Sequence, residues 1–295
     1  MPLRIATRGS ELALWQARHV ADELTRRNDG LVVELVIVST EGDRRTDVPL
    51  QQMGGKGVFV KEVQAALLDG RADVAVHSAK DLPAETPDGL VIAAIPERAD
   101  ARDALIGARL GELPEGATVA TGAPRRRAQL AALRPDLKFA ELRGNIDTRL
   151  AKSGDFGAIV MAMAAITRLG RSPDVVDALA VEVMIPQVGQ GALAIECRSD
   201  DEATHGVLAG LDHAPSRRTV TAERAFLRRL GGDCDLPAGA HAILADDGTI
   251  TLSAVMAFDF RVPLATVVRV GGDPLTVGER AAAALLAAGS EGSDS

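Results

Sequence analysis

The sequence predicts an α/β protein with two lobes joined by two crossings, followed by a small C-terminal α+β domain. Short apolar segments alternate with helical segments through the first lobe and again through the second, which is typical of sheets covered by helices. The C-terminal part lacks this alternation. A chain of 295 residues is long enough for two or three domains. We expect a discontinuous first lobe at 1–97 and 190–212, a second lobe at 98–189 and a third domain at 213–295.

The first lobe begins directly with a strand. Ser10 precedes an amphipathic segment that ends near Arg27, and its hydroxyl is the predicted N-cap of that helix. Leu31–Val38 is a continuous apolar run of the kind that is buried on both faces of a sheet. Residues 39–57 have no periodicity, which is typical of a lid or an insert. The remaining predicted elements are strands at Leu3–Thr7, Ala72–Ser78 and Val91–Ile95 and a helix at Val58–Leu68.

In the second lobe each predicted strand leads into a helix. The predicted strands are Thr118–Thr121, Lys138–Leu142 and Ala158–Met161. Of the three helices that follow them, the first begins at Pro124, the second begins at Asn145 and the third ends near Leu169. Val188-Gly189-Gln190-Gly191 then precedes an apolar strand, Ala192–Cys197, which we expect to return to the first lobe.

The third domain is predicted to contain strands flanked by helices. The predicted elements are a helix at Ser216–Leu230, strands at Ala240–Leu244, Thr249–Ala257 and Val262–Val270, a helix at Pro274–Ala288 and a loose tail at Gly289–Ser295.

The composition excludes several classes of partner. The net charge of −8 argues against nucleic acid or an anionic membrane, and no apolar run approaches the roughly 20 residues of a membrane span. The N-terminal residues read as a strand rather than a targeting signal, and two cysteines give neither a disulfide framework nor a metal cluster. We therefore expect a cytoplasmic protein without a metal.

A lysine and an aspartate follow the strand that ends at Ser78. Residues just beyond the carboxyl end of a strand line the ligand crevice of an open α/β sheet. There Lys80 could hold an anion, while Asp81 could stabilise positive charge or move protons. The alternative interpretation is an exposed ion pair in a surface loop, which would contribute little.

Basic residues recur at other strand ends. Three arginines, Arg125 to Arg127, lie in the first turn of a predicted helix, where the helix dipole already makes positive charge unfavourable. A bound anion would explain them, and a solvated basic helix start is the alternative. Arg143, Asn145 and Arg149 repeat the arrangement one strand later, Arg8 holds the equivalent place in the first lobe, and Lys56 lies in the predicted lid. The set indicates a ligand with several carboxylates or phosphates, and nucleotide-binding motifs are absent from the sequence.

Cys234 lies in a glycine-rich loop between Asp233 and Asp235. Neighbouring carboxylates should raise the pKa of the thiol, so Cys234 is a poor nucleophile. It could carry a permanent attachment, or it could be an inert exposed thiol.

Several of these segments together resemble the hydroxymethylbilane synthase (porphobilinogen deaminase) family. The segments that carry the resemblance are, in chain order, Arg4–Arg8, Gly54–Gly57, His77–Pro83, Leu142–Asn145, Thr148–Leu150, Val188–Gly191, Thr221–Arg224 and the loop around Cys234. The resemblance implies lobes like those of periplasmic binding proteins and a monomeric transferase of porphyrin and heme biosynthesis. The implied reaction joins four porphobilinogen molecules head to tail, with loss of ammonia, into the linear tetrapyrrole hydroxymethylbilane. A covalent dipyrromethane cofactor primes the chain, and hydrolysis releases it.

The resemblance also assigns roles to residues. Asp81 matches the catalytic aspartate, and Cys234 matches the cysteine that holds the dipyrromethane through a thioether. Cofactor binding is assigned to Arg8, Ser10, Lys80, Thr121, Arg125, Arg126, Arg143, Asn145, Arg149 and Gln190. Substrate or lid roles are assigned to Gln16, Lys56, Phe59 and Arg168. The chain departs from the family where Gly122-Ala123 replaces two serines and where Asp233 and Asp235 flank the cysteine.

Two other classes of protein share some of these features. A non-catalytic bilobal binding protein for a small polyanion would have the same lobes, but it gives no reason for a third domain that carries a cysteine. An anion-sensing regulator would need a basic face or a helix-turn-helix segment for DNA, and the sequence shows neither.

Overall fold

The computed structural model describes residues 1–40, 60–231, 236–258 and 264–292. By its contacts the chain divides into two units, one comprising Met1–Ala99 with Ala192–Arg217 and the other Asp100–Gly191 with Arg218–Ser295. Each unit is described by itself.

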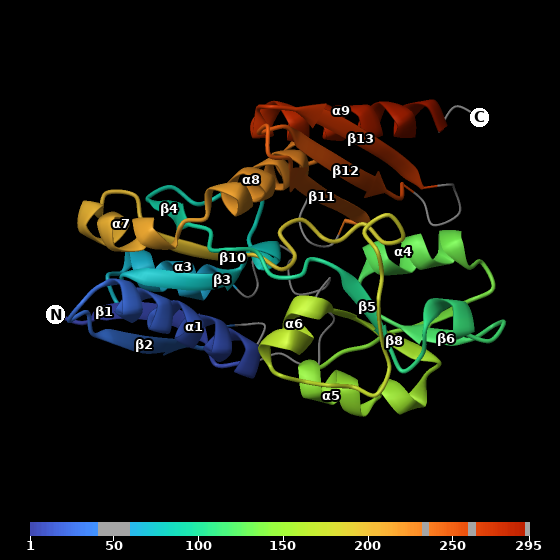
Figure 1. The fold of residues 1–295 in the computed structure, drawn as a ribbon, viewed down its shortest axis with the longest axis horizontal. Coiled ribbons are helices and arrows are strands. Elements are labelled where there is room, and N and C mark those ends of the chain that lie inside the picture. Colours follow the sequence, from blue (N-terminus) through green and yellow to red (C-terminus); the bar gives the residue numbers. More distant parts are fainter. Residues whose placement is uncertain (41–59, 232–235, 259–263, 293–295) are drawn as a thin grey trace. The chain divides into compact units, whose positions relative to one another are not determined.

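The first unit is built on a mixed five-stranded sheet in the order β2-β1-β3-β10-β4 (Figure 1). Its strands are β1 (Leu3–Arg8), β2 (Val33–Val38), β3 (Val74–Ser78), β4 (Leu90–Ala94) and β10 (Leu193–Arg198). β1 pairs in parallel with β2 and β3, whereas β10 runs antiparallel between β3 and β4. The predicted return of the later strand to the first lobe is therefore confirmed.

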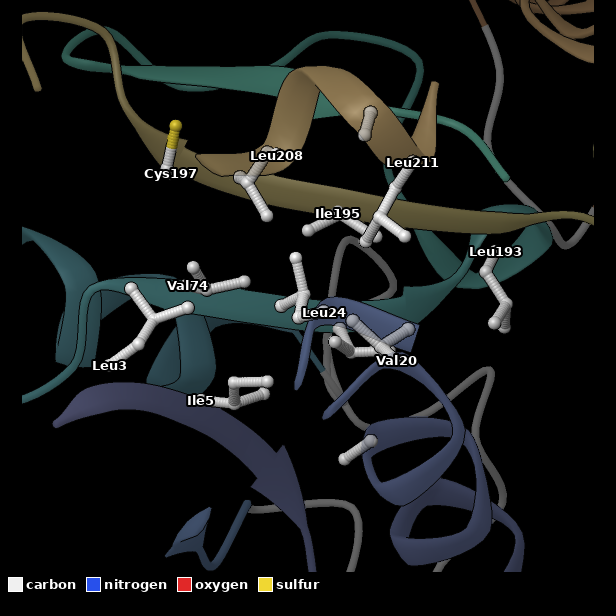
Figure 2. Close-up of a cluster of buried hydrophobic side chains, with 13 residues drawn as sticks. Leu3, Ile5, Val20, Leu24, Val74, Leu193, Ile195, Cys197, Leu208 and Leu211 are labelled. Carbon is white, nitrogen blue, oxygen red and sulfur yellow. The ribbon is translucent and has the colours of Figure 1, made fainter. Parts of the chain in front are cut away.

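Helices cover both faces of this sheet. The helices are α1 (Glu11–Arg27), α3 (Lys61–Leu68) and α7 (Glu202–Leu208). On one face, Val20 and Leu24 of α1 pack with Ile5, Val74 and Ile195 of the sheet, as Figure 2 shows. On the other face α3 packs against the sheet through a second apolar cluster. The predicted cap of α1 is confirmed, because the Ser10 side chain accepts a hydrogen bond from the backbone N–H of Ala13.

The prediction that the second strand is buried on both faces was wrong. β2 begins at Val33 and lies at the edge of the sheet, and Ile37 remains 55% exposed. A continuous apolar run is also compatible with an edge strand, because position in the sheet depends on partners far along the chain.

The second unit contains another five-stranded sheet, in the order β7-β6-β8-β5-β9. Its strands are β5 (Asp103–Ile106), β6 (Thr118–Ala120), β7 (Lys138–Ala140), β8 (Ala158–Ala162) and β9 (Val176–Ala178), and its helices are α4 (Pro124–Leu133), α5 (Ile146–Ala151) and α6 (Met163–Arg168). β6 pairs in parallel with β7 and β8, while β5 is antiparallel to β8 and β9. β5 and β9 were not predicted from the sequence.

The C-terminal part carries a three-stranded antiparallel sheet and helices, as predicted. Its elements are α8 (Ala214–Arg229), β11 (Ala238–Leu244), β12 (Ile250–Met256), β13 (Ala265–Gly271) and α9 (Pro274–Gly292). α9 runs further than predicted, to Gly292. A methyl group on Gly289 would lie 2.4 Å from the Phe258 ring, so this ring packs directly on the helix backbone.

Single turns of 3-10 helix occur at Ala79–Asp81, Leu110–Glu112, Ser153–Asp155 and Ala209–Leu211. Among the described helices, none has the length and apolar character needed to cross a membrane. In the same part of the chain, no group of His, Cys, Asp and Glu side chains could hold a metal ion.

Candidate active site

A hollow opens in the first unit at the carboxyl ends of β1 and β3. Its volume is about 320 Å³, which includes some of the adjoining solvent. The polar groups that line it are Arg8, Gln16, His77, Ser78 and Asp81, and the apolar wall comes from Ala13, Val60, Val63 and Val76. Three of the residues predicted for the site, Arg8, Gln16 and Asp81, thus share one hollow.

Local structure explains how Asp81 reaches this hollow. β3 ends at Ser78, a single 3-10 turn over Ala79–Asp81 follows, and Pro83 cannot continue a regular ladder. Leu82 is buried, and the backbone N–H of Ala79 donates to the carbonyl of Ala192 on the neighbouring strand, 3.0 Å away. The turn that carries Asp81 is therefore anchored at both ends.

Gln16 ties α1 to the same strand end. Gln16 is 3% exposed, and its Nε2 donates to the Ser78 hydroxyl at 2.8 Å. Thr7 adds a bond from its hydroxyl to the carbonyl of Ala13 at 3.1 Å. Gln16 is therefore a structural tie between α1 and β3 as well as a lining residue, while Ser10 caps the helix that carries it.

A buried polar trio lies beside the hollow. The His77 Nε2 atom is 3.1 Å from a carboxylate oxygen of Glu196, whose side chain is fully buried. Gln64 of α3 donates from Nε2 to both oxygens of Glu196, at 3.1 Å and 3.0 Å. His77 lies in one of the segments that resemble the family, but no role was predicted from the sequence for His77, Glu196 or Gln64. A glutamate within an otherwise apolar strand was the signal that could have drawn attention to this position.

The second unit has its own charged cluster, centred on Asp103. Arg125 donates to one carboxylate oxygen of Asp103 at 2.7 Å, and Arg126 donates to the other at 3.1 and 2.8 Å. Gln190 donates to the same carboxylate at 2.9 Å. Burial opposes ionisation of Asp103, but the charges of Arg125 and Arg126 outweigh it and hold the pKa of this carboxyl well below its usual range.

Arg125 and Arg126 are thus buried side chains rather than open cationic arms. Arg125 also donates to the carbonyl of Ile185 at 2.6 Å, and Arg126 donates to the carbonyl of Val160 at 3.1 Å. Their assignment as cofactor ligands remains a prediction. The cluster itself holds two guanidinium charges against one carboxylate, so its described side chains carry a net positive charge.

Thr121 lies just before this cluster. Thr121 is 5% exposed, and its hydroxyl accepts a hydrogen bond from the backbone N–H of Ala123 at 3.2 Å. The hydroxyl shapes the chain that leads into α4, where Pro124 occupies the first turn.

The turn before α5 leaves its basic residues accessible. Arg143 and Asn145 are exposed, and the Asn145 side chain accepts a hydrogen bond from the backbone N–H of Thr148, which confirms it as the N-cap. Arg149 is half-buried and donates to the carbonyl of Gly144 at 2.8 Å.

Arg168, at the end of α6, is more enclosed. It donates to the carbonyl of Gly191 at 2.7 Å, and burial lowers its pKa to about 10. The guanidinium remains protonated at neutral pH, so it adds a cation to the second unit.

Several predicted residues fall elsewhere. Lys80 is described, in the turn beside Asp81, and is half-buried. Lys56, Phe59 and Cys234 lie outside the described residues.

Comparison with known proteins decides the family. Residues 3–206 match the family model described as porphobilinogen deaminase, dipyrromethane cofactor binding domain, and residues 217–287 match the porphobilinogen deaminase C-terminal domain. The chain belongs to the porphobilinogen deaminase family. It is therefore an enzyme of the transferase class.

Relatives named porphobilinogen deaminase extend over nearly the whole chain. The protein of Nitratidesulfovibrio vulgaris is 51% identical over 86% of this chain and 82% of its own length. The protein of Brevibacillus brevis is 47% identical over 97% of this chain and 94% of its own length. Among solved structures, the periplasmic aliphatic sulphonate binding protein SsuA from Escherichia coli aligns at 16% identity over 77% of this chain and 70% of that chain, with a TM-score of 0.40.

The described residues fit the pyrrole cofactor that the porphobilinogen deaminase family model names. A dipyrromethane offers carboxylate side chains, which need cations, and ring N–H groups, which need an acceptor. Arg8 and Asp81 present those two kinds of group in the hollow, and Arg143 presents a cation in the second unit. The donor and acceptor chemistry of this chain is therefore suited to the cofactor.

Proposed function

We propose that this chain joins four porphobilinogen molecules head to tail, with loss of ammonia, to give hydroxymethylbilane. The observation that carries the proposal is the hollow in which a guanidinium, an amide and the Asp81 carboxylate come together at two strand ends. This combination suits a ligand that is anionic at its side chains and becomes cationic at its ring.

The residues of the hollow divide these tasks. Porphobilinogen carries acetate and propionate groups, and the guanidinium of Arg8 can hold one of them by charge-assisted hydrogen bonds. Expulsion of ammonia turns the substrate into a cationic azafulvene. Asp81 accepts hydrogen bonds from pyrrole N–H groups and stabilises the positive charge as it develops. Gln16 and Ser78, bonded to each other, fix the wall against which the ring lies.

The cofactor supplies, when bound, a covalent pyrrole primer onto which substrate rings are added. We propose that Cys234 holds it through a thioether. The side chains proposed to bind its carboxylates and rings are Arg8, Ser10, Lys80, Thr121, Arg125, Arg126, Arg143, Asn145, Arg149 and Gln190. Arg125 and Arg126 would act from their buried cluster, whose excess positive charge favours an anion nearby. Water finally releases the linear product.

The attachment has a direct test. The intact mass of the purified protein should exceed the mass of the sequence by one dipyrromethane. Cys234→Ala should abolish this added mass, together with the colour that pyrroles give with Ehrlich's reagent. Cys197→Ala is the matched control: Cys197 is 0% exposed in β10, and burial raises its pKa to about 11, so it should not react.

Added mass that persists in Cys234→Ala would contradict the assignment of the cysteine. A wild-type protein of unmodified mass that cannot be loaded by porphobilinogen would contradict the proposed function as a whole.

A further inference from the structure

One side chain of the hollow has no part in the reaction described so far. His77 lines the hollow, yet its side chain is 5% exposed, so most of the imidazole lies inside the protein. Its Nε2 atom lies 3.1 Å from Glu196 but makes no hydrogen bond in the described structure. Buried polar atoms are nearly always hydrogen-bonded, so an exception of this kind points to a functional role.

The surroundings of His77 are those of an oriented base. Glu196 is 0% exposed and is held by Gln64 through both carboxylate oxygens. Burying a carboxylate is costly unless polar groups lie beside it, and the Gln64 amide and the imidazole of His77 are the groups that face Glu196. The same pattern, a base held by a third group, recurs in enzymes that activate a nucleophile.

The strand that carries Glu196 is irregular at this residue. The pairing between β10 and β4 shifts register between Ile195 and Glu196, whereas the pairing between β10 and β3 is regular. Bulges in strands commonly re-aim a side chain next to an active site. The carboxylate is therefore positioned against His77 from a strand that carries a local irregularity at that residue.

Resting on the proposed function, we propose that His77 accepts the proton released each time one porphobilinogen-derived ring couples to the next. Glu196 is the positioning residue that orients the imidazole and balances its charge. Asp81 has the separate task of stabilising the cationic ring through its carboxylate. The hollow thus assigns charge stabilisation and proton transfer to two different side chains.

Each proton and each electron pair in the coupling step can be accounted for. The substrate enters with its amine as an ammonium group, and expulsion leaves ammonia and a cationic ring. A carbon–carbon bond forms to the free α-carbon of the receiving ring, whose C–H bond then breaks. Its electrons return to the ring and its proton passes to the imidazole of His77. The imidazolium hands this proton to ammonia, which leaves as ammonium.

The test uses cofactor-loaded protein and porphobilinogen carrying deuterium at the free α-carbon. Single-turnover ring addition, followed by mass spectrometry, should fall roughly 10²–10⁴-fold in His77→Gln, the usual size of a general-base contribution. A primary isotope effect that is absent in the wild type should appear in the variant, because proton removal becomes rate-limiting. Glu196→Gln should show the same isotope effect with a smaller loss of rate. The control is His19→Gln, since His19 stacks on Trp15 outside the lining of the hollow.

A second measurement does not depend on turnover or on a folded His77 variant. Unlabelled porphobilinogen is added to the Cys234→Ala protein, and the histidine ring nitrogens are followed by NMR. The His77 signals should shift on binding, while those of His19 should not. Two results would overturn the inference and leave the proposed function standing. One is normal ring addition in His77→Gln without an isotope effect, and the other is His77 signals that do not shift when porphobilinogen is added. A wild type that adds no rings would overturn both.

Discussion

At the scale of single residues, the position of Asp81 in the hollow is the feature that bears most directly on the reaction. It lies in the hollow with Arg8 and Gln16, on a turn fixed by a buried leucine and a backbone bond to β10. A carboxylate that lines the hollow is placed to meet a ligand that enters it. Its contribution should therefore appear in the rate of reaction and not in the stability of the fold.

We predict that Asp81→Asn slows ring addition about 10²–10⁴-fold, the range typical of a lost catalytic carboxylate. The amide keeps the shape of the side chain and some hydrogen bonding but removes the charge that stabilises the cationic ring. The measurement is single-turnover ring addition on protein whose cofactor mass has been checked, with folding followed by the melting temperature. Asp88→Asn, at an exposed position in the same loop, is the control and should react normally. Normal turnover in Asp81→Asn would return it to an ordinary surface carboxylate.

The residue scale also shows where prediction from sequence ended. Three arginines at a helix N-terminus oppose the helix dipole, so the sequence marks Arg125 and Arg126 as unusual, while their role as cofactor ligands stays a prediction. Their partner, Asp103, lies on β5 and contacts them only through the tertiary fold. A partner more than twenty positions away leaves no periodic signal in the sequence. The contact of Glu196 with His77 could not be predicted for the same reason, because the two residues lie far apart in the sequence.

At the scale of elements, local signals were sufficient at several helix starts where a side chain acts on its own backbone. Ser10 and Asn145 cap α1 and α5, and Pro124 occupies the first turn of α4, as predicted. β5 and β9 were missed because four and three residues are too few for a period to be visible. The edge position of β2 depends on sheet order, which only the assembled fold determines.

The turn that leads into α5 gives a prediction at this scale. Gly144 has φ +118°, and a methyl group built on it would lie 2.6 Å from the Thr148 side chain. Gly144→Ala should therefore lower the free energy of unfolding by roughly 1–3 kcal/mol, because the backbone strain and the clash act together. Urea denaturation measures the change. Gly154→Ala is the control, since that glycine has no positive φ and no atom within 4 Å of the added methyl group.

Gly144→Ala should also weaken cofactor loading, because the turn presents Arg143 and supplies the carbonyl to which Arg149 donates. Unchanged stability in Gly144→Ala would show that this turn adapts to a side chain, and the placement of Arg143 and Arg149 would then need another explanation.

At the scale of the whole molecule, an acidic protein uses buried and half-buried arginines to hold carboxylates in their charged form. Arginine partners lower the pKa of Asp73 in the first unit and of Asp103 and Asp136 in the second. A net charge of −8 destabilises the compact state through repulsion between like charges. The arginine–aspartate pairs oppose this repulsion at the positions of these three carboxylates. Stability should therefore depend on pH mainly on the acid side.

Whether stability rises or falls with pH depends on whether the folded or the unfolded chain binds more protons. Asp103 titrates in the unfolded chain near the ordinary value of about 3.9, whereas the folded pKa is held well below it. The stability contributed by Asp103 is thus fully present above pH ~5 and is lost as the pH falls through ~4 toward the depressed folded value. We predict that the urea midpoint of the second unit's unfolding falls steadily between pH ~5 and ~3.

Asp103→Asn should lower this midpoint at pH 7, by an amount corresponding to about 3–5 kcal/mol, because two buried guanidinium groups lose their counter-charge. The difference from wild type should shrink below pH ~4, where the unfolded wild-type carboxyl takes up a proton and the variant has none to take up. Glu112→Gln is the control, since its pair with Arg109 spans 4.0 Å between side chains that are 65% and 68% exposed. Its midpoint should follow the wild-type curve. Parallel curves for wild type and Asp103→Asn across the whole acid range would show that Asp103 is not held ionised in the folded protein.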